Sequence, residues 1–182
     1  IVGEHAVLHG PALPAALPAC TTGISREVPA VIRVTRDADD EPDEQYITHK
    51  ILPILRVAAE FGISVHPIST GRNWGYGSWL PTVDRCIVLD LGGIRRIRHF
   101  DAELGIVAIE PGVTQAQLSR FLLENNHPYL VPVTGAGPHC SLLGNALERG
   151  YGITPISDHF ASVLSLEAVL ADGTRYRSPM EE

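Results

Sequence analysis

The sequence lacks several features that mark common classes of protein. Its three cysteines (Cys20, Cys86, Cys140) are widely spaced and form no CxxC pair, so neither a disulfide framework nor a zinc ribbon is predicted. No apolar run approaches the ~18 residues of a membrane span, and no basic segment followed by an apolar stretch opens the chain. Fourteen basic against 21 acidic residues give a net charge of −7, which disfavours a nucleic-acid partner.

The composition that is present is ordinary for a globular protein. Hydrophobic residues make up 45% and charged residues 19% of the 182 positions, which argues against disorder and suits one domain or two small lobes. The odd cysteine count favours a reducing compartment, and we expect a cytoplasmic protein. Because the chain opens at Ile1 without methionine and ends at Glu182 without a closing signal, we expect a piece of a longer protein.

Hydrophobic periodicity predicts an α+β order of elements. We expect a helix over 44–61 that Pro53 kinks and Gly62 ends. A second helix should start at the cap residue Thr114, and a short third one should cover 141–149. The expected strands are 30–35, 63–68, 86–91 (before a Gly92-Gly93 turn), 94–100 and 105–110, with a closing hairpin over 163–176 through a type I′-like turn at Asp172-Gly173.

Glycine is concentrated in two windows, 71–78 and 135–152, which together hold eight of the 17 glycines. The first window follows a predicted strand, where a tight glycine loop points successive N–H groups at an anion. It has no lysine for a Walker A loop, and Leu80 and Cys140 stand where the third glycine of a G-x-G-x-x-G motif would be.

Two interpretations of the first window remain. One is a phosphate-binding loop between two strands, and the other is a structural loop whose aromatic residues only pack. The candidate donors are Ser69, Thr70, Arg72, Asn73 and Ser78, and the aromatic residues are Trp74, Tyr76 and Trp79.

The second window carries a glycine inside a helical pattern and leads to a pair of ionisable residues. Gly144 costs about 1 kcal/mol relative to alanine in a helix, so we infer that another group approaches it closely. The adjacent Asp158 and His159 could form a general acid/base unit or half of a metal site. Alternatively, Asp158 caps a turn beside an ordinary histidine. The spacing of His139 and His159 supports no metal, and none is predicted.

Four motifs in order resemble the FAD-binding domain of the vanillyl-alcohol oxidase / p-cresol methylhydroxylase flavoprotein family. Each is weak alone, but the ordered set is specific, and the similarity covers residues 30–178. The motifs are PISTGRNWGYG at 67–77, IEPGVT at 109–114, LGNALERGYGITP at 143–155 running into DHF at 158–160, and LADG at 170–173.

The resemblance implies an α+β, two-lobed FAD-binding domain of the p-cresol methylhydroxylase type. The first lobe (30–92) would form a small mixed sheet with helices, and the proline-rich residues 1–29 before it are expected, from their own composition, to form an extended N-terminal segment. The second lobe (93–182) would form a larger, mostly antiparallel sheet, incomplete at its C-terminal end. The two glycine windows would lie at the junction of the lobes, and a substrate-binding cap domain would be absent.

The resemblance also implies roles for individual residues. The loop at the FAD pyrophosphate would comprise Ser69, Thr70, Gly71, Arg72, Asn73, Trp74, Gly75, Tyr76 and Gly77. A second set of FAD contacts would comprise Ser141, Gly144, Asn145, Gly150, Gly152 and Thr154. Asp158 matches an acidic residue near flavin N5 in the alkylphenol-oxidising members, and Ile156 and Ser157 depart from the aromatic residue and glycine usual there.

The function implied is that of an FAD-linked oxidoreductase, an oxidase or a dehydrogenase. A small-molecule donor, a phenolic or other alcohol or hydroxy compound, would bind in the missing cap domain and be oxidised by hydride transfer to flavin N5. The electron acceptor would be oxygen, a cytochrome or a quinone. We expect this part alone to be inactive, and any homo-oligomer to form through regions not present. The alternative is a non-catalytic or degenerate FAD- or nucleotide-binding module.

Overall fold

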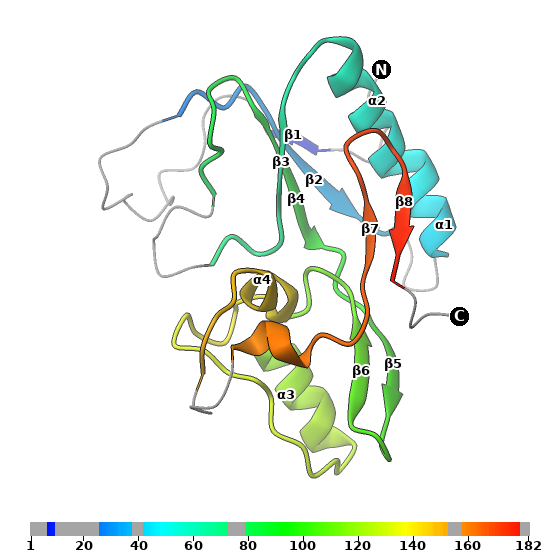
Figure 1. The fold of residues 1–182 in the computed structure, drawn as a ribbon, viewed down its shortest axis with the longest axis vertical. Helices are drawn as coiled ribbons and strands as arrows, with labels where there is room; N and C mark the ends of the chain where they lie inside the picture. The colour runs from blue at the N-terminus through cyan, green and yellow to red at the C-terminus, as the bar shows by residue number, and fades with distance from the viewer. Residues whose placement is uncertain (1–6, 10–25, 38–41, 73–78, 153–157, 179–182) are drawn as a thin grey trace.

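The computed structural model describes residues 7–9, 26–37, 42–72, 79–152 and 158–178. These residues form two lobes that follow one another along the long axis of the molecule (Figure 1). The chain passes from the first lobe to the second after strand β4 and later returns to the side of the first lobe in a hairpin.

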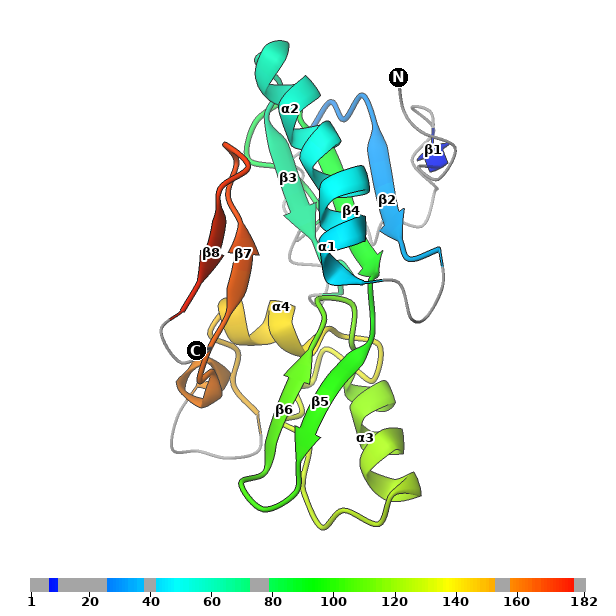
Figure 2. The ribbon, with the colours of Figure 1, turned by 90° about the vertical axis from the view of Figure 1, so that its right-hand side faces the viewer.

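The first lobe is built on one mixed sheet with the strand order β1-β2-β4-β3. Strands β2, β4 and β3 run parallel, and β1 is antiparallel to β2. Both faces of the sheet are covered, as parallel strands require: helices pack on one face (Figure 2), and Val28 and Trp79 pack on the other. The strands are β1 (Val7–His9), β2 (Val31–Thr35), β3 (Val65–Ile68) and β4 (Ile87–Gly93).

The helical cover of this sheet is continuous but not uniform. An α-helical turn, α1 (Asp43–Tyr46), leads into a π-helical stretch, η1 (Ile47–Ile51), and then into α2 (Leu52–Glu60). Pro53 lies in the first turn of α2, directly after the π-helical stretch, where its ring and missing N–H interrupt the regular i→i−4 bonding of the continuous helix. Gly62 ends the helix with φ of +61°.

The second lobe packs helix α3 (Gln115–Glu124) on a two-stranded antiparallel ladder of β5 (Ile97–Asp101) and β6 (Ile106–Ile109). Thr114 caps α3, because its Oγ1 accepts a hydrogen bond of 3.2 Å from the Gln117 amide. Two short helices follow, α4 (Leu142–Leu147) and the 3₁₀ turn η2 (His159–Ser162). The buried core of this lobe comprises Val113, Leu118, Leu122 and Leu142.

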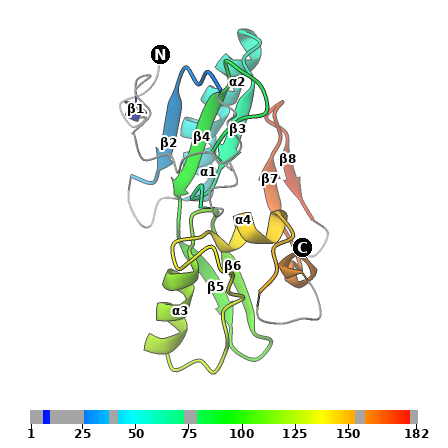
Figure 3. The same cartoon turned by 90° about the vertical axis from the view of Figure 1, so that its left-hand side faces the viewer.

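The last element is a hairpin of β7 (Glu167–Val169) and β8 (Arg175–Arg177) that lies beside the helices of the first lobe (Figures 2 and 3). Val169 packs against the first-lobe core, and Arg175 is hydrogen-bonded to Glu44. The hairpin turn closes with a 2.9 Å bond from the Gly173 amide to the Leu170 carbonyl. Gly173 has φ of +85° and Asp172 has no positive φ, so the predicted type I′-like turn is wrong: the geometry is a type I turn followed by a left-handed glycine.

The α+β class and the order of a small mixed sheet followed by antiparallel strands are confirmed. Within the described residues, the antiparallel part consists of two separate two-stranded ladders rather than one larger sheet. The expected Gly92-Gly93 turn is instead the end of β4, and a short strand, β1, interrupts the N-terminal segment. No helix among the described residues is long and apolar enough to cross a membrane.

Candidate functional site: the junction of two glycine loops

The described part of the first glycine window follows β3 at the carboxyl ends of the parallel strands. Ligands bind open α/β sheets at this edge. Ser69 and Thr70 leave the strand directly, and Gly71 follows with φ of +63°, a conformation that favours glycine. A Cβ on Gly71 would lie 1.9 Å from Trp79 Nε1. The packing of the indole therefore requires glycine at position 71.

Ser141 joins the first loop to the second. Its amide donates a 3.0 Å hydrogen bond to Thr70 Oγ1, and its hydroxyl donates one of 2.7 Å to the Pro111 carbonyl. The same hydroxyl accepts a 3.0 Å bond from the Gly144 amide and so caps α4. Because Ser141 is 3% exposed and both its amide and its hydroxyl are hydrogen-bonded within the chain, it holds three segments together.

The close approach inferred at Gly144 is confirmed, and the approaching group belongs to the first loop. A Cβ on Gly144 would lie 2.6 Å from Ser69 Oγ, a distance that Cβ contacts do not tolerate. Ser69 and Thr70, which lead into the first glycine window, thus lie against the second window between the lobes (Figure 1), and 71 residues separate the partners of the Thr70–Ser141 bond.

Two further glycines of the second loop, Gly150 and Gly152, make room for an asparagine and a histidine. A Cβ on Gly150 would lie 1.9 Å from Asn145 Nδ2, and one on Gly152 would lie 2.2 Å from the Val133 carbonyl and 2.7 Å from His159 Nε2. His159 Nδ1 is hydrogen-bonded to Asn145 Oδ1, and an amide oxygen only accepts, so Nδ1 is the donor. The His159 amide donates a 2.8 Å bond to the Gly150 carbonyl, which fixes the loop against η2.

Asp158 lies at the start of η2 with both carboxylate oxygens engaged. Oδ1 accepts a 3.1 Å hydrogen bond from the Ala161 amide and caps the helical turn, while Oδ2 contacts Arg149 Nη1 at 3.1 Å. The Arg149 guanidinium also lies 5.1 Å from the Phe160 ring centroid. Capping, one of the interpretations of this carboxylate from the sequence, is therefore observed, and the Asp158 carboxylate is ion-paired with the exposed side chain of Arg149.

The comparisons with known proteins agree on one family. The model of a family described as "FAD binding domain" matches residues 48–178. The 1'-carboxy-chondrochloren decarboxylase of Chondromyces crocatus is 38% identical over 161 residues, 88% of this chain and 28% of that protein. The 4-cresol dehydrogenase [hydroxylating] flavoprotein subunit of Pseudomonas putida is 36% identical over 127 residues, 70% of this chain and 24% of that protein.

A solved structure agrees with these relatives. The crystal structure of p-cresol methylhydroxylase with substrate bound superimposes with a TM-score of 0.75 at 31% identity, over 86% of this chain and 28% of that chain. The chain belongs to the FAD binding domain family. It spans about a quarter of the length of the curated relatives named above.

FAD is therefore the cofactor of this domain, and the residues of the junction fit it. Glycine at 71 and 144 lets Trp79 and Ser69 pack directly against the backbone, which brings the two loops together at the edge of the sheet where ligands of open α/β sheets bind. The Ser69 and Thr70 hydroxyls and the Arg72 guanidinium are donors suited to phosphate oxygens. That Ser69, Thr70, Gly71, Arg72 and the described residues of the second loop contact FAD stays a prediction.

The remaining predicted contacts of the FAD-binding domain lie outside the described residues. They are Asn73, Trp74, Gly75, Tyr76, Gly77 and Thr154, together with the departures at Ile156 and Ser157. No group of three metal-ligating side chains occurs within the ranges that the structure describes.

A cluster of ion pairs joins the lobes behind the loops, and only part of it had a signal in the sequence. Arg36 follows β2 and is paired with both Asp43 and Glu110, with its guanidinium 4.4 Å from the Tyr46 ring centroid. Glu110 belongs to the IEPGVT motif, whereas nothing in the sequence singled out Arg36. Arg96 and Arg98 complete the cluster, at 2.8 and 2.7 Å from the Asp43 carboxylate.

Burial and the charges of this cluster shift the pKa of Asp43, a member of the cluster, and the pKa of Tyr46, which lies beside it. Burial raises the pKa of Asp43, but the hydrogen bond from Arg36 and the positive charges of Arg98, Arg36 and Arg96 outweigh it and bring the pKa below its usual range. Burial, reinforced by the carboxylates of Asp43 and Glu110, raises the pKa of Tyr46 to about 12.

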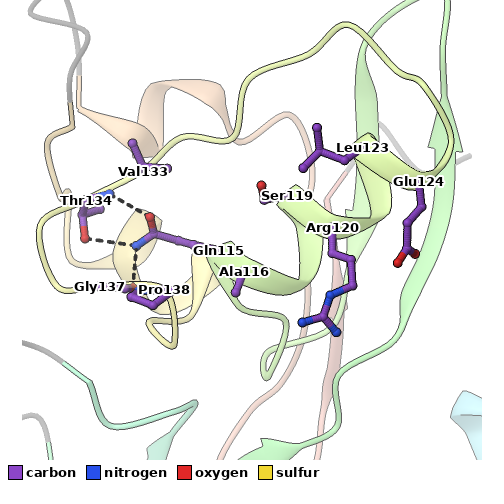
Figure 4. A pocket seen from close by; sticks show the side chains of 10 residues that line it. All are labelled: Gln115, Ala116, Ser119, Arg120, Leu123, Glu124, Val133, Thr134, Gly137 and Pro138. Atoms are coloured by element: carbon purple, nitrogen blue, oxygen red, sulfur yellow. Dashed lines mark hydrogen bonds between the residues drawn. The ribbon is translucent and has the colours of Figure 1, made fainter.

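A groove of about 720 Å³ beside α3 is separate from the loop junction (Figure 4). Gln115 is one of the residues that line it. The side-chain Nε2 of Gln115 donates to Thr134 Oγ1 at 3.3 Å and to the Gly137 carbonyl at 3.2 Å, and Oε1 accepts from the Thr134 amide at 3.0 Å. None of the predicted FAD contacts lines this groove. The backbone N–H of Gln115 also donates a 3.1 Å hydrogen bond to the Cys140 carbonyl. Gln115 therefore holds the segment that leads into Ser141.

Proposed function

We propose that the protein is an FAD-linked oxidoreductase, in which this domain holds FAD between its two glycine loops and a part of the protein outside this chain binds the electron donor. The observation that carries the proposal is the joining of the first loop to the second through the Thr70–Ser141 bond and the Ser69–Gly144 contact. When bound, FAD supplies the acceptor for a hydride at flavin N5. The protein's part is to orient the cofactor and to set the charge around it.

The proposed donor is a phenolic or other hydroxy compound, and the acceptor is oxygen, a cytochrome or a quinone. One relative is named for 4-cresol, a phenol, and another is named a decarboxylase of a 1'-carboxy compound. A donor panel should therefore include para-substituted phenols, hydroxy acids, and phenols that carry a carboxyl group.

Asp158 is the proposed acidic residue near flavin N5. Its carboxylate would favour positive charge and protons near the reacting atoms, and Arg149 would limit that effect by holding Oδ2. The cap on Ala161 fixes the direction of the side chain, so that the carboxylate is positioned before any donor binds.

The test uses the full-length protein with bound FAD, whose absorbance at about 450 nm reports the oxidised flavin. We expect at least one donor of the panel to bleach this band under anaerobic conditions. Asp158→Asn keeps the helix cap, since asparagine caps as well as aspartate, and should slow flavin reduction with little change in FAD affinity. Asp158→Ala removes the cap as well, and comparison of the two separates the charge from the cap. Equal reduction rates in wild type and Asp158→Asn would remove the catalytic role of Asp158.

The second candidate is a non-catalytic FAD-binding module. It is favoured by the engagement of both Asp158 oxygens in the cap and the ion pair. Bound FAD that no donor of the panel reduces would support it.

A further inference from the structure

Glu110 is a buried carboxylate, and both of its oxygens accept hydrogen bonds from arginine residues. It is 3% exposed, Oε1 is paired with the Arg36 guanidinium, and Oε2 accepts a 2.6 Å hydrogen bond from the Arg96 amide. The Glu110 amide in turn donates a 3.0 Å bond to the Arg96 carbonyl. Arg36 comes from the first lobe and Arg96 from the approach to β5, so Glu110 lies where the two lobes are joined.

The turn that follows Glu110 has little freedom to move. The Gly112 amide donates a 2.7 Å bond to the Ile94 carbonyl, and the Val113 amide donates one of 3.1 Å to the Glu110 carbonyl. A Cβ on Gly112 would lie 2.6 Å from both the Gly92 and the Ile94 carbonyl oxygens. The turn is therefore pressed against the chain that crosses from β4 to β5.

The Pro111 carbonyl, which lies between Glu110 and Gly112, is hydrogen-bonded to the junction of the two glycine loops. Pro111 accepts the 2.7 Å bond from the Ser141 hydroxyl, and the Ser141 amide donates the 3.0 Å bond to Thr70 Oγ1 in the first loop. A continuous series of contacts thus runs from the Arg36 ion pair through Glu110, Pro111 and Ser141 to Thr70.

We propose that Glu110 is a positioning residue for FAD binding: it fixes the Pro111 carbonyl, and through Ser141 it sets the place of the first glycine loop. Glu110 itself does not touch the cofactor. The inference rests on the proposed function only in taking the loop that begins at Ser69 as the segment that binds the pyrophosphate.

The test measures FAD affinity in a double-mutant cycle, with full-length protein stripped of FAD and titrated with it. Glu110→Gln keeps the size of the side chain but places an amide against the Arg36 guanidinium and the Arg96 backbone N–H. Ser141→Ala removes the hydroxyl that donates a hydrogen bond to the Pro111 carbonyl. We expect each change to weaken FAD binding about tenfold, which corresponds to about 1.4 kcal/mol. Because both changes interrupt the same series of contacts, the double variant should also be about tenfold weaker rather than about a hundredfold.

Glu44→Gln is the matched control, since Glu44 is an exposed carboxylate that is paired with Arg175 rather than with the arginines that hold Glu110. It should leave FAD affinity unchanged. At saturating FAD, the rate of flavin reduction in Glu110→Gln should return to that of the wild type, because only binding is affected. If Glu110→Gln does not fold, Arg36→Lys replaces it in the cycle, since lysine keeps the charge but lacks the planar guanidinium that pairs with Glu110 and lies over the Tyr46 ring.

Two results overturn the inference. One is unchanged FAD affinity in the folded Glu110→Gln protein, which would make the ion pair purely structural. The other is FAD binding about a hundredfold weaker in the double variant, the product of the two single effects, which would show that Glu110 and Ser141 act independently. Both are distinct from failure of the proposed function, in which wild-type protein binds FAD normally but no donor reduces it.

Discussion

Replacing Gly144 with alanine tests the contact between the two glycine loops, because two effects of known size oppose each other at this position. Alanine in place of glycine stabilises a helix by up to about 1 kcal/mol. The new Cβ, however, would lie 2.6 Å from Ser69 Oγ, with Ser141 Oγ at 3.4 Å. The serine hydroxyl must therefore move, and an unfavourable side-chain rotamer costs about 0.5–1.5 kcal/mol. We expect the free energy of unfolding to change by less than about 0.5 kcal/mol.

The expected result changes when Ser69 is also replaced. In a Ser69→Ala background the clashing oxygen is absent, so Gly144→Ala should stabilise the protein by the full amount of about 1 kcal/mol. FAD affinity should fall with Gly144→Ala in the wild-type background, because the Ser69 hydroxyl has turned away, and should not fall further when Ser69 is already alanine.

The assay is urea unfolding of the four apo proteins followed by circular dichroism, with FAD titrations on the same samples. Equal stabilisation by Gly144→Ala in both backgrounds would refute the reasoning, since it would mean that Ser69 does not lie against Gly144.

Three further predictions concern the surroundings of the loops. Gly71→Ala should destabilise the protein by about 1–2 kcal/mol for the left-handed backbone alone, and by more because the Cβ would meet Trp79; it should also weaken FAD binding, and an unchanged urea midpoint would contradict the packing. Burial raises the pKa of Tyr46 to about 12, so the phenol ionises more easily in the unfolded chain, and the free energy of unfolding should fall as the pH rises from about 10. Tyr46→Phe should lessen this fall in thermal unfolding experiments across that pH range. Identical pH dependence in the two proteins would argue against a buried phenol at position 46. Burial raises the pKa of the Cys86 thiol, so iodoacetamide should label Cys86, read by mass spectrometry, much more slowly in folded protein than in urea; equal rates would show that the thiol is accessible.

Local signals in the sequence predicted most elements of the fold. The β-branched run at Val31 became β2, Thr114 caps α3, and Gly62 ends α2, because each depends on a few neighbouring residues. The π-helical stretch before Pro53 was not predicted, since the sequence shows only that an interruption is needed and not how the backbone absorbs it. Gly92 and Gly93 extend β4 instead of turning, because β2 pairs with the strand as far as Gly93 and the Glu110 turn packs on Gly92.

The candidate site shows the same division between local and distant information. Glycine at position 144 indicated a close neighbour, but only the fold identifies that neighbour as Ser69. The acid–imidazole pair predicted that Asp158 and His159 matter, but their partners Arg149 and Asn145 depend on how the second loop bends. Arg36 was missed because a single arginine after a strand carries no pattern, and its significance comes from a carboxylate 74 positions away.

The β7–β8 hairpin bears on the order in which the chain can fold during synthesis. Glu44, at the start of the first-lobe helices, bonds Arg175, which lies 131 positions later, and Val169 completes the apolar cluster of that lobe. A ribosome releases the helices long before it releases the hairpin, so part of their apolar surface stays uncovered while the second lobe is made. Contacts so distant in sequence form slowly. We therefore expect the first lobe to reach its final packing last, although its residues emerge first.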